Sequence, residues 1–309
     1  MSTLTEDQKN LYAGHLHELT RRWEAALAFA GFDAAIVAAG QPGEYFLDDQ
    51  TTPFRPNPHF AQWVPEDDVV GSALLIRPGE QPRLYFYQPA DYWHQPPQPP
   101  DWAGAHLDLE VCDDPARLHE ALASAAAQQN RTAFIGELEP GNLPVSSVNP
   151  ALLLSHLHFH RAYKSAFEVH CMQAATALAV AGHRAAGDAF RTGGSEFEIH
   201  MAYLAASRQT SDALPYGNIV ALNEHGSVLH YQHYDREPPD QSRSFLIDAG
   251  GRYRGYAADI TRTYAAEGAE HERFAALVAA MDQAQQSMIR DIRTGMDYLE
   301  LHEDAHRRI

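Results

Sequence analysis

The sequence is poor in cysteine and has no long apolar run, and each shortage excludes a class of protein. Cys112 and Cys171 are the two cysteines among 309 residues, too few for a disulfide framework and without zinc-finger spacing, so we expect both to be reduced. No stretch approaches the roughly 18 consecutive apolar residues of a membrane span. Residues 1–10 contain Glu6 and Asp7 and no apolar run, unlike a secretory leader. These absences predict a cytoplasmic protein with no membrane partner.

Basic residues are also scarce relative to acidic ones. Lys and Arg total 23 against 41 Asp and Glu, giving a formal net charge of −18. Such a surface repels nucleic acid and anionic membranes, so we expect no nucleic-acid partner. The acidic excess is compatible with general solubility and also with carboxylates gathered around metal ions. The positions of the carboxylates must decide between these interpretations.

The length and a hydrophobic content of 45% indicate two domains. In the first half, apolar residues at helical spacing end at a glycine, and short β-type runs alternate with a further helical segment. This pattern predicts an α/β domain over residues 1–160. The expected elements are a helix over Leu11–Gly31, strands over Ala34–Ala38, Ser72–Ile76 and Arg83–Tyr87, and a helix over Ala116–Gln128.

The pattern changes near Leu152–Tyr163, which we interpret as a short strand, and a second domain is expected over residues 161–309. Long helical patterns open it, and the second of them begins with Ser195 and Glu198 at the spacing of a capping box. β-type runs and two more helical segments follow. The expected helices are Ser165–Phe190, Ser195–Arg208, Glu270–Arg293 and one from Tyr298, and the expected strands are Asn218–Leu222, Val228–His233, Arg243–Asp248 and Gly255–Thr263.

The most informative segment is a predicted hairpin with an aspartate on each arm. Asp248 ends an apolar strand, a glycine-rich turn follows, and the return strand brings Asp259 back. If the turn is centred between Tyr253 and Arg254, the two aspartates face each other with Cβ atoms roughly 4.5–5.5 Å apart. Carboxylates held so close repel, so either one is protonated or a cation lies between them. Two Asp residues also commonly flank a simple hairpin turn, and spacing alone leaves both interpretations open.

Longer motifs around this hairpin resemble a known family. Asp248-Ala249-Gly250 and the run from Gly255 to Thr263 are similar to the metal-binding hairpin of the pita-bread metallopeptidases, which include Xaa-Pro dipeptidases, aminopeptidase P, methionine aminopeptidase and creatinase. Further segments resemble the bacterial Xaa-Pro dipeptidases and the similar organophosphorus acid anhydrolases in particular, so the resemblance covers nearly the whole chain. These segments are Tyr216–His225, Val228–Tyr231, Phe46–Asp49, Asp91–His94 and His160–Lys164.

The resemblance implies an α/β (α+β) protein with a creatinase/prolidase-like N-terminal domain followed by a pita-bread catalytic domain. It also implies two divalent metal ions, preferably Mn²⁺ with Co²⁺ or Zn²⁺ as alternatives, held by two Asp, one His and two Glu around a bridging hydroxide. Asp248 and Asp259 match the first two ligands. Oxygen-rich sites with a single imidazole suit manganese, and paired metals activate water and polarise a carbonyl.

The resemblance further assigns residues around the metals. His230 matches a histidine that contacts substrate or stabilises the reacting centre, although a histidine in an apolar strand is often structural. Tyr216 and Tyr298 are expected to bind substrate. Asp49 matches a residue that reaches into the active site of a second subunit, which implies a homodimer; a simple turn carboxylate explains Asp49 nearly as well. The implied substrate is a small dipeptide with a C-terminal proline.

The remaining ligands of the family are missing from these 309 residues. The family's Pro-His-Gly segment, Glu-Pro-Gly turn and final glutamate do not occur after Asp259, so we expect a truncated chain that holds the first half of the pita-bread domain and is inactive as given. Alternatives to the dipeptidase are an organophosphate hydrolase at the same metals, or a non-catalytic binding or assembly module. The absent ligands favour the second alternative.

Two histidine patterns are given less weight. His302-Glu303-Asp304-Ala305-His306 has the spacing of a zinc-protease helix, but its flanks are charged, which favours a polar helix face. Three histidines, His156, His158 and His160, alternate along the predicted strand and could face a metal together. A solvated strand face explains them more simply.

Overall fold

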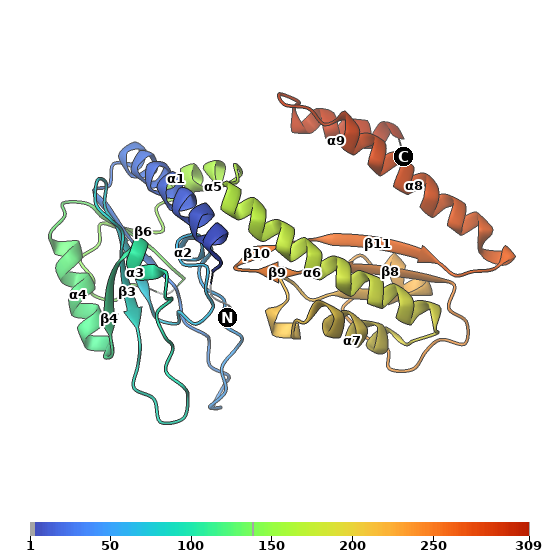
Figure 1. Cartoon of the computed structure of the whole chain (residues 1–309), viewed down its shortest axis with the longest axis horizontal. Helices are drawn as coiled ribbons and strands as arrows, with labels where there is room; N and C mark the ends of the chain where they lie inside the picture. The colour runs from blue at the N-terminus through green and yellow to red at the C-terminus, as the bar shows by residue number, and fades with distance from the viewer. Residues whose placement is uncertain (1–3, 138, 309) are drawn as a thin grey trace. The chain divides into compact units, whose positions relative to one another are not determined.

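A computed structural model describes residues 4–137 and 139–308, and the chain divides into two compact units (Figure 1). The first unit comprises the chain up to Ala174 together with Tyr253–Tyr256. The second comprises Ala175–Arg252 and the chain from Ala257 onward. Tyr253–Tyr256 is therefore a segment that returns, late in the sequence, to the first unit.

A six-stranded mixed sheet forms the centre of the first unit, with strand order β4-β3-β2-β1-β5-β6. β1 pairs antiparallel with β2 and parallel with β5, which is typical of an α/β domain. The three predicted strands are confirmed as β1, β2 and β3, whereas β4, β5 and β6 were not predicted. The strands are β1 (Ala34–Ala38), β2 (Ala73–Ile76), β3 (Arg83–Tyr87), β4 (Asp108–Cys112), β5 (Thr132–Ile135) and β6 (Ser147–Val148).

Both faces of this sheet are buried, because alternate residues of a strand point to opposite faces. Ala35 and Val37 of β1 pack in one cluster with Trp23 and Leu27 of helix α1 (Glu6–Ala30). Ala34 and Ile36 pack in another with Leu118 and Leu122 of helix α4 (Pro115–Ala127). The strand is therefore apolar throughout, and α1 and α4 cover opposite faces of the sheet (Figure 1).

Helix α1 begins earlier than its apolar pattern indicates. The Thr5 side chain accepts a hydrogen bond from the Gln8 N–H while Gln8 bonds back to the Thr5 N–H, a reciprocal cap that satisfies two free backbone donors. Gly31 ends the helix with φ 73°, as its position in the sequence predicts. Two single-turn helices, α2 (Pro58–Ala61) and α3 (Ala103–His106), complete the first half of the chain.

The strand predicted at Leu152–Tyr163 is wrong: this segment is helix α5 (Ala151–His160). Its alternating Leu and His residues imitate a strand, but Leu153 and Leu157, four residues apart on one helical face, are both buried in the core shared with α1. The predicted domain division at 160/161 falls at the end of this helix.

The three histidines of α5 consequently do not share a face. His156 and His160 lie one turn apart with ring centroids at 4.4 Å. His158 points elsewhere and stacks on His59 of α2, with the two Nε2 atoms 3.1 Å apart. His59 is buried, and burial, followed by the charge of Arg161 and by His158, lowers its pKa to about 4.

We expect the protein to lose stability as the pH falls from about 6.5 to 4. In this window the unfolded chain binds a proton at His59 that the folded chain resists, so the free energy of unfolding falls by up to about 3 kcal/mol. Urea unfolding at pH 7.0 and 4.5 checks this. His59→Gln should flatten the pH dependence, whereas His17→Gln, an exposed control on α1, should leave it unchanged; equal slopes in the two variants would contradict the assignment.

The second unit is a three-stranded antiparallel sheet, order β11-β8-β7, packed against two helices. Helix α7 begins at the capping box formed by Ser195 and Glu198, which confirms that prediction. The core joins Phe190 of α6 and Tyr203 of α7 to Phe245 and Ile247 of β8. The elements of this half of the chain, in which the start of α6 and residues Tyr253–Tyr256 belong to the first unit, are α6 (Ala166–Arg191), α7 (Glu196–Ser207), β7 (Ile219–Leu222), β8 (Ser244–Ala249), β9 (Arg252–Tyr253), β10 (Tyr256–Ala257) and β11 (Ile260–Ala265).

The strand predicted at Val228–His233 is also wrong. A 3-10 helix over Asn223–Ser227 follows β7, and residues 228–230 form a turn. The alternating pattern does not reflect a buried face, since Val228 and Leu229 are exposed and Tyr231 is buried. This irregular segment carries the predicted catalytic histidine.

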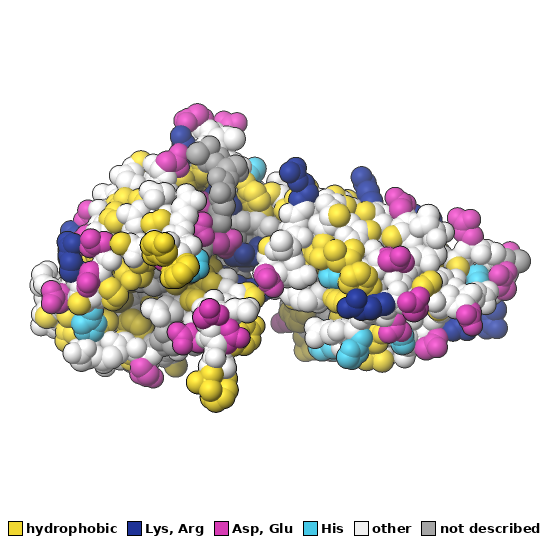
Figure 2. All heavy atoms as spheres, turned by 90° about the horizontal axis from the view of Figure 1, so that it is seen from below, with side chains coloured by type: hydrophobic (Ala, Val, Ile, Leu, Met, Phe, Trp, Pro, Cys, Tyr) yellow, Lys and Arg dark blue, Asp and Glu magenta, His cyan; other side chains and the backbone are white. Residues whose placement is uncertain are grey.

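Helices α8 (Glu272–Asp291) and α9 (Tyr298–Arg308) follow the sheet, as predicted. On α9, the rings of His302 and His306 lie 4.6 Å apart, while Glu303 and Asp304 lie within ion-pair distance of Arg307. Acidic side chains are spread over the face of the protein in Figure 2, consistent with the net charge. In the described part of the chain, no helix combines the length and the hydrophobicity needed to cross a membrane.

Candidate metal centre

Strand β8 positions Asp248 through its alternation. Phe245, Ile247 and Ala249 are buried against α6 and α7, so the residues between them point to the other face of the sheet. Asp248 is on that second face and pairs with Ile219 of β7 on one side and Thr261 of β11 on the other. The buried residues thus fix the direction of the aspartate.

The register of the hairpin differs from the prediction. Asp248 pairs with Thr261, so Asp259 lies two residues along from the directly opposite position. The turn is at Arg254 and Gly255, which have φ angles of 49° and 81°, as a tight turn with two left-handed residues requires. Because a strand alternates with period two, a displacement of two residues keeps both aspartates on one face.

The hydroxyl of Tyr216 brings the two carboxylates together. It lies 2.7 Å from an Asp248 oxygen and 2.9 Å from an Asp259 oxygen. Burial, together with the two carboxylates, raises the pKa of Tyr216 well above its usual value, so the phenol remains protonated. The Tyr216 O–H can donate to only one of the two carboxylates at a time. The phenol oxygen and the two carboxylate oxygens that it contacts therefore share one proton.

This donor set fits a hard divalent cation. Two carboxylates on one sheet face, with Asp259 exposed and Asp248 partly exposed, supply oxygen ligands of the kind that Mn²⁺ and Mg²⁺ prefer. A cation between them would offset the repulsion that the Tyr216 proton relieves only in part. Asp248 and Asp259 are therefore the side chains in this region that could hold a metal ion.

Two glycines after Asp248 allow the close packing of the hairpin. A Cβ atom on Gly250 would lie 2.2 Å from the Ala258 carbonyl oxygen, and one on Gly251 would lie 2.3 Å from the Ala175 carbonyl oxygen of α6. Residues with side chains cannot approach so closely. The Asp-Ala-Gly-Gly sequence therefore sets how near the arm that carries Asp248 lies to its neighbours.

The other predicted site residues are not joined to this pair. Among the described residues, no hydrogen bond or ring contact links His230 to Asp248 or Asp259, and His230 is exposed. Asp49 is exposed in a loop of the first unit that Glu44 and Thr51 close. Tyr298, the first residue of α9, is 84% exposed. Their roles stay predictions.

The sequence analysis missed a second polar cluster, in which Glu196 is central. Ligand atoms of Glu196, His225 and Asp235 lie within 4.8 Å of one another. Glu196 is buried although its side chain is a carboxyl group, and its place directly after the capping Ser195 indicates only the start of a helix. The available signal in the sequence was an acidic residue, Glu196, among the residues that α7 turns toward the sheet.

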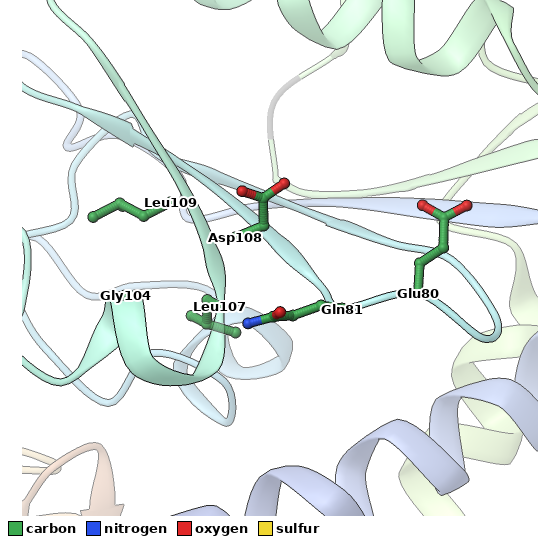
Figure 3. Close-up of a pocket in the computed structure, with 6 residues that line it drawn as sticks. All are labelled: Glu80, Gln81, Gly104, Leu107, Asp108 and Leu109. Carbon is green, nitrogen blue, oxygen red and sulfur yellow. The ribbon is translucent and has the colours of Figure 1, made fainter.

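Two cavities lie in the first unit, away from these carboxylates in sequence. One, of about 540 Å³, is formed by the turn before β3, α3 and β4 (Figure 3). Its two carboxylates are both paired, Asp108 with Arg83 at 2.6 Å and Glu80 with Arg77 at 3.0 Å. The other, of about 940 Å³, is lined in part by the proline-rich segment 95–100, a loop as its composition predicts. Neither is lined by a predicted ligand.

Comparison with known proteins matches both halves of the chain. Residues 10–159 match the family model described as "Xaa-Pro dipeptidase, N-terminal domain", and residues 170–309 match "Metallopeptidase family M24". An Xaa-Pro dipeptidase of Stenotrophomonas maltophilia (strain K279a) is 46% identical over 98% of this chain and 68% of its own length. One from Xanthomonas campestris pv. campestris (strain 8004) is 46% identical over 96% of this chain and 66% of its own length.

Solved structures show the same fold. Aminopeptidase PepP of Pseudomonas aeruginosa superimposes with a TM-score of 0.73 at 23% identity, covering 100% of this chain and 73% of that one. A zinc-substituted aminopeptidase P of Escherichia coli in complex with product gives 0.72 at 18% identity, covering 99% and 73%. The chain thus spans about two thirds of the length of its curated relatives. The family models and the curated relatives show that the chain belongs to the M24 metallopeptidases and, within them, to the bacterial Xaa-Pro dipeptidases.

Proposed function

We propose that this chain belongs to a metal-dependent dipeptidase that hydrolyses dipeptides with a C-terminal proline, with Mn²⁺ preferred over Co²⁺ and Zn²⁺. The observation that carries the proposal is the Asp248, Asp259 and Tyr216 oxygen cluster in a chain of this family. Bound divalent ions would lower the pKa of water and polarise the peptide carbonyl. The curated relatives are named for the same substrate class.

Each of the candidate site residues has its own role in this proposal. Asp248 and Asp259 hold metal, and the protonated Tyr216 keeps their carboxylates oriented toward one point. His230, exposed and free to face a bound ligand, contacts the substrate or the developing charge. Tyr298 contributes to the substrate site. Asp49, on its exposed loop, reaches the site of a second subunit in a cytoplasmic homodimer.

The direct test compares two chains. The first is residues 1–309; the second, called the extended chain, continues with the remaining third of the Stenotrophomonas dipeptidase. We expect Mn²⁺-dependent hydrolysis of Leu-Pro by the extended chain and none by residues 1–309, with Leu-Gly as the control substrate and size-exclusion chromatography to report the dimer. Absence of activity in both would contradict the dipeptidase proposal, and activity of residues 1–309 would contradict the need for further ligands.

His230→Ala in the extended chain should lower kcat about a hundredfold or more while Mn²⁺ binding stays stoichiometric, because the imidazole acts on substrate and does not bind metal. Steady-state kinetics and metal analysis by mass spectrometry check this. The nearby exposed His233 offers a matched control, and His233→Ala should retain its rate. A His230 variant that loses its metal would show instead that the imidazole is a ligand.

A further inference from the structure

Glu196 anchors the irregular segment 222–235 through a carboxylate whose two oxygens each accept two hydrogen bonds. The residue is 1% exposed and is the first of α7. One oxygen accepts hydrogen bonds from the Leu222 N–H at 2.9 Å and from His225 Nδ1 at 2.8 Å. The other accepts from the Tyr231 hydroxyl at 2.9 Å and the Asp235 N–H at 3.0 Å. Leu222 is the last residue of β7, and the other three donors belong to the segment that joins β7 to β8.

The same geometry argues against a metal ion at this cluster. Each carboxylate oxygen of Glu196 already has two donors, which is its full capacity. The Nδ1 atom of His225 is also used, because it is directed at Glu196. A cation would have to displace these donors from the buried Glu196 carboxylate. The cluster is therefore built to hold the backbone.

The anchor lies next to the predicted catalytic histidine. Tyr231, adjacent to His230, is buried and stacks on His225 with ring centroids at 4.5 Å and an interplanar angle of 19°. On the other side of His230, Val228 and Leu229 are exposed. No strand pairing holds residues 228–235 among the described residues. The position of His230 thus depends on its neighbour Tyr231 and, through it, on Glu196.

We propose that Glu196 is a positioning residue for the dipeptidase reaction: its four hydrogen bonds hold segment 222–235 in the shape that presents His230 to the substrate. The inference rests on the proposed function, since it takes His230 as the group that acts on substrate. Glu196 itself is buried and touches no substrate.

The charges around His225 support this anchor. The hydrogen bond to Glu196, and then the charge of that carboxylate with smaller contributions from Asp235 and Glu224, raises the pKa of His225. A cationic donor strengthens a hydrogen bond to a carboxylate. Replacing Glu196 with glutamine should therefore return the pKa of His225 toward its ordinary value, which NMR titration of the imidazole in residues 1–309 can measure.

The test is Glu196→Gln, compared with Glu198→Gln. Glutamine keeps the size of the side chain but presents an NH₂ group to two of the four donors. Glu198, two residues away, caps the same helix, and glutamine also serves in a capping box. In residues 1–309 we expect hydrogen exchange of the Asp235 amide to accelerate about tenfold or more in Glu196→Gln and to stay unchanged in Glu198→Gln.

In the extended chain, Glu196→Gln should lower kcat roughly a hundredfold, as small misplacements of reacting groups do. The decisive comparison adds His230→Ala. If Glu196 acts through His230, Glu196→Gln has no further effect on kcat in that background. Additive losses, or unaccelerated exchange at Asp235, would overturn the inference. An extended chain that hydrolyses no Leu-Pro would refute the proposed function instead, and the exchange result would still decide whether the anchor exists.

Discussion

Asp259→Ala in the extended chain should reduce Mn²⁺-dependent hydrolysis of Leu-Pro to about one per cent or less. The residue is one of two carboxylates gathered at the Tyr216 hydroxyl, and its loss leaves a single carboxylate on that sheet face. Metal ions contribute several kcal/mol of transition-state stabilisation, which corresponds to a hundredfold change in rate or more. Calorimetric titration with Mn²⁺ should show the loss of binding directly.

A matched control separates this effect from a general change in charge. Asp240 is exposed in the loop that precedes β8. Asp240→Ala removes the same carboxylate from the same unit and should retain both activity and metal. Retention of more than a few per cent of activity by Asp259→Ala would remove Asp259 from the ligand set. Loss of activity in Asp259→Ala would also show that the activity of the extended chain depends on residues 1–309 and does not come from the added third alone.

Gly251→Ala should lower the free energy of unfolding by about 3 kcal/mol or more. The added methyl group would lie 2.3 Å from the Ala175 carbonyl oxygen and 3.0 Å from the Ala179 nitrogen, both in the backbone of α6. A helix backbone cannot rotate away as a side chain can, so the hairpin or the helix must shift, and overpacking of this kind costs 1–3 kcal/mol or more. Urea unfolding of residues 1–309 measures the loss.

Gly226→Ala is the control for this effect. Gly226 lies in the same unit, and its added methyl group would be 3.7 Å from the nearest neighbouring atom, the Cβ of Leu246, which is an ordinary contact distance. We expect a change within about 0.5–1 kcal/mol. Equal effects of the two substitutions would mean that the close approach of the hairpin to α6 is not what Gly251 provides.

Local signals in the sequence predicted much of the fold. The glycine after α1 and the Ser195 and Glu198 pair mark helix ends through backbone hydrogen bonds that any tertiary context must satisfy. Short strands with polar residues, such as β4, carry no such signal, because their pairing depends on neighbours distant in sequence. At α5, an alternation over a few residues was outweighed by the burial of Leu153 and Leu157.

The candidate site shows the same division. The motif indicates Asp248 and Asp259 as candidate ligands, but the register depends on which residues of the turn adopt positive φ, and Arg254 together with Gly255 does so. The contact of both carboxylates with Tyr216 brings together residues at or near the ends of β7, β8 and β11. It depends on how these strands pair in the sheet, which the sequence does not show. The sequence does not indicate the role of Glu196 for a related reason. Its four hydrogen-bond donors come close to its carboxylate only when α7 packs on β7.

The tip of the hairpin that carries Asp248 and Asp259 has a consequence for how the chain is made. Arg254 pairs with Glu66 at 2.6 Å, and the Tyr256 hydroxyl bonds to the buried Glu168, so these late residues complete the hydrogen bonding of the first unit. During synthesis, Glu66 and Glu168 cannot form these interactions until Arg254 and Tyr256 have been translated. The first unit therefore cannot reach its final state as a nascent segment ending at Ala174, and its completion is timed to the emergence of the arm that carries Asp248 and Asp259.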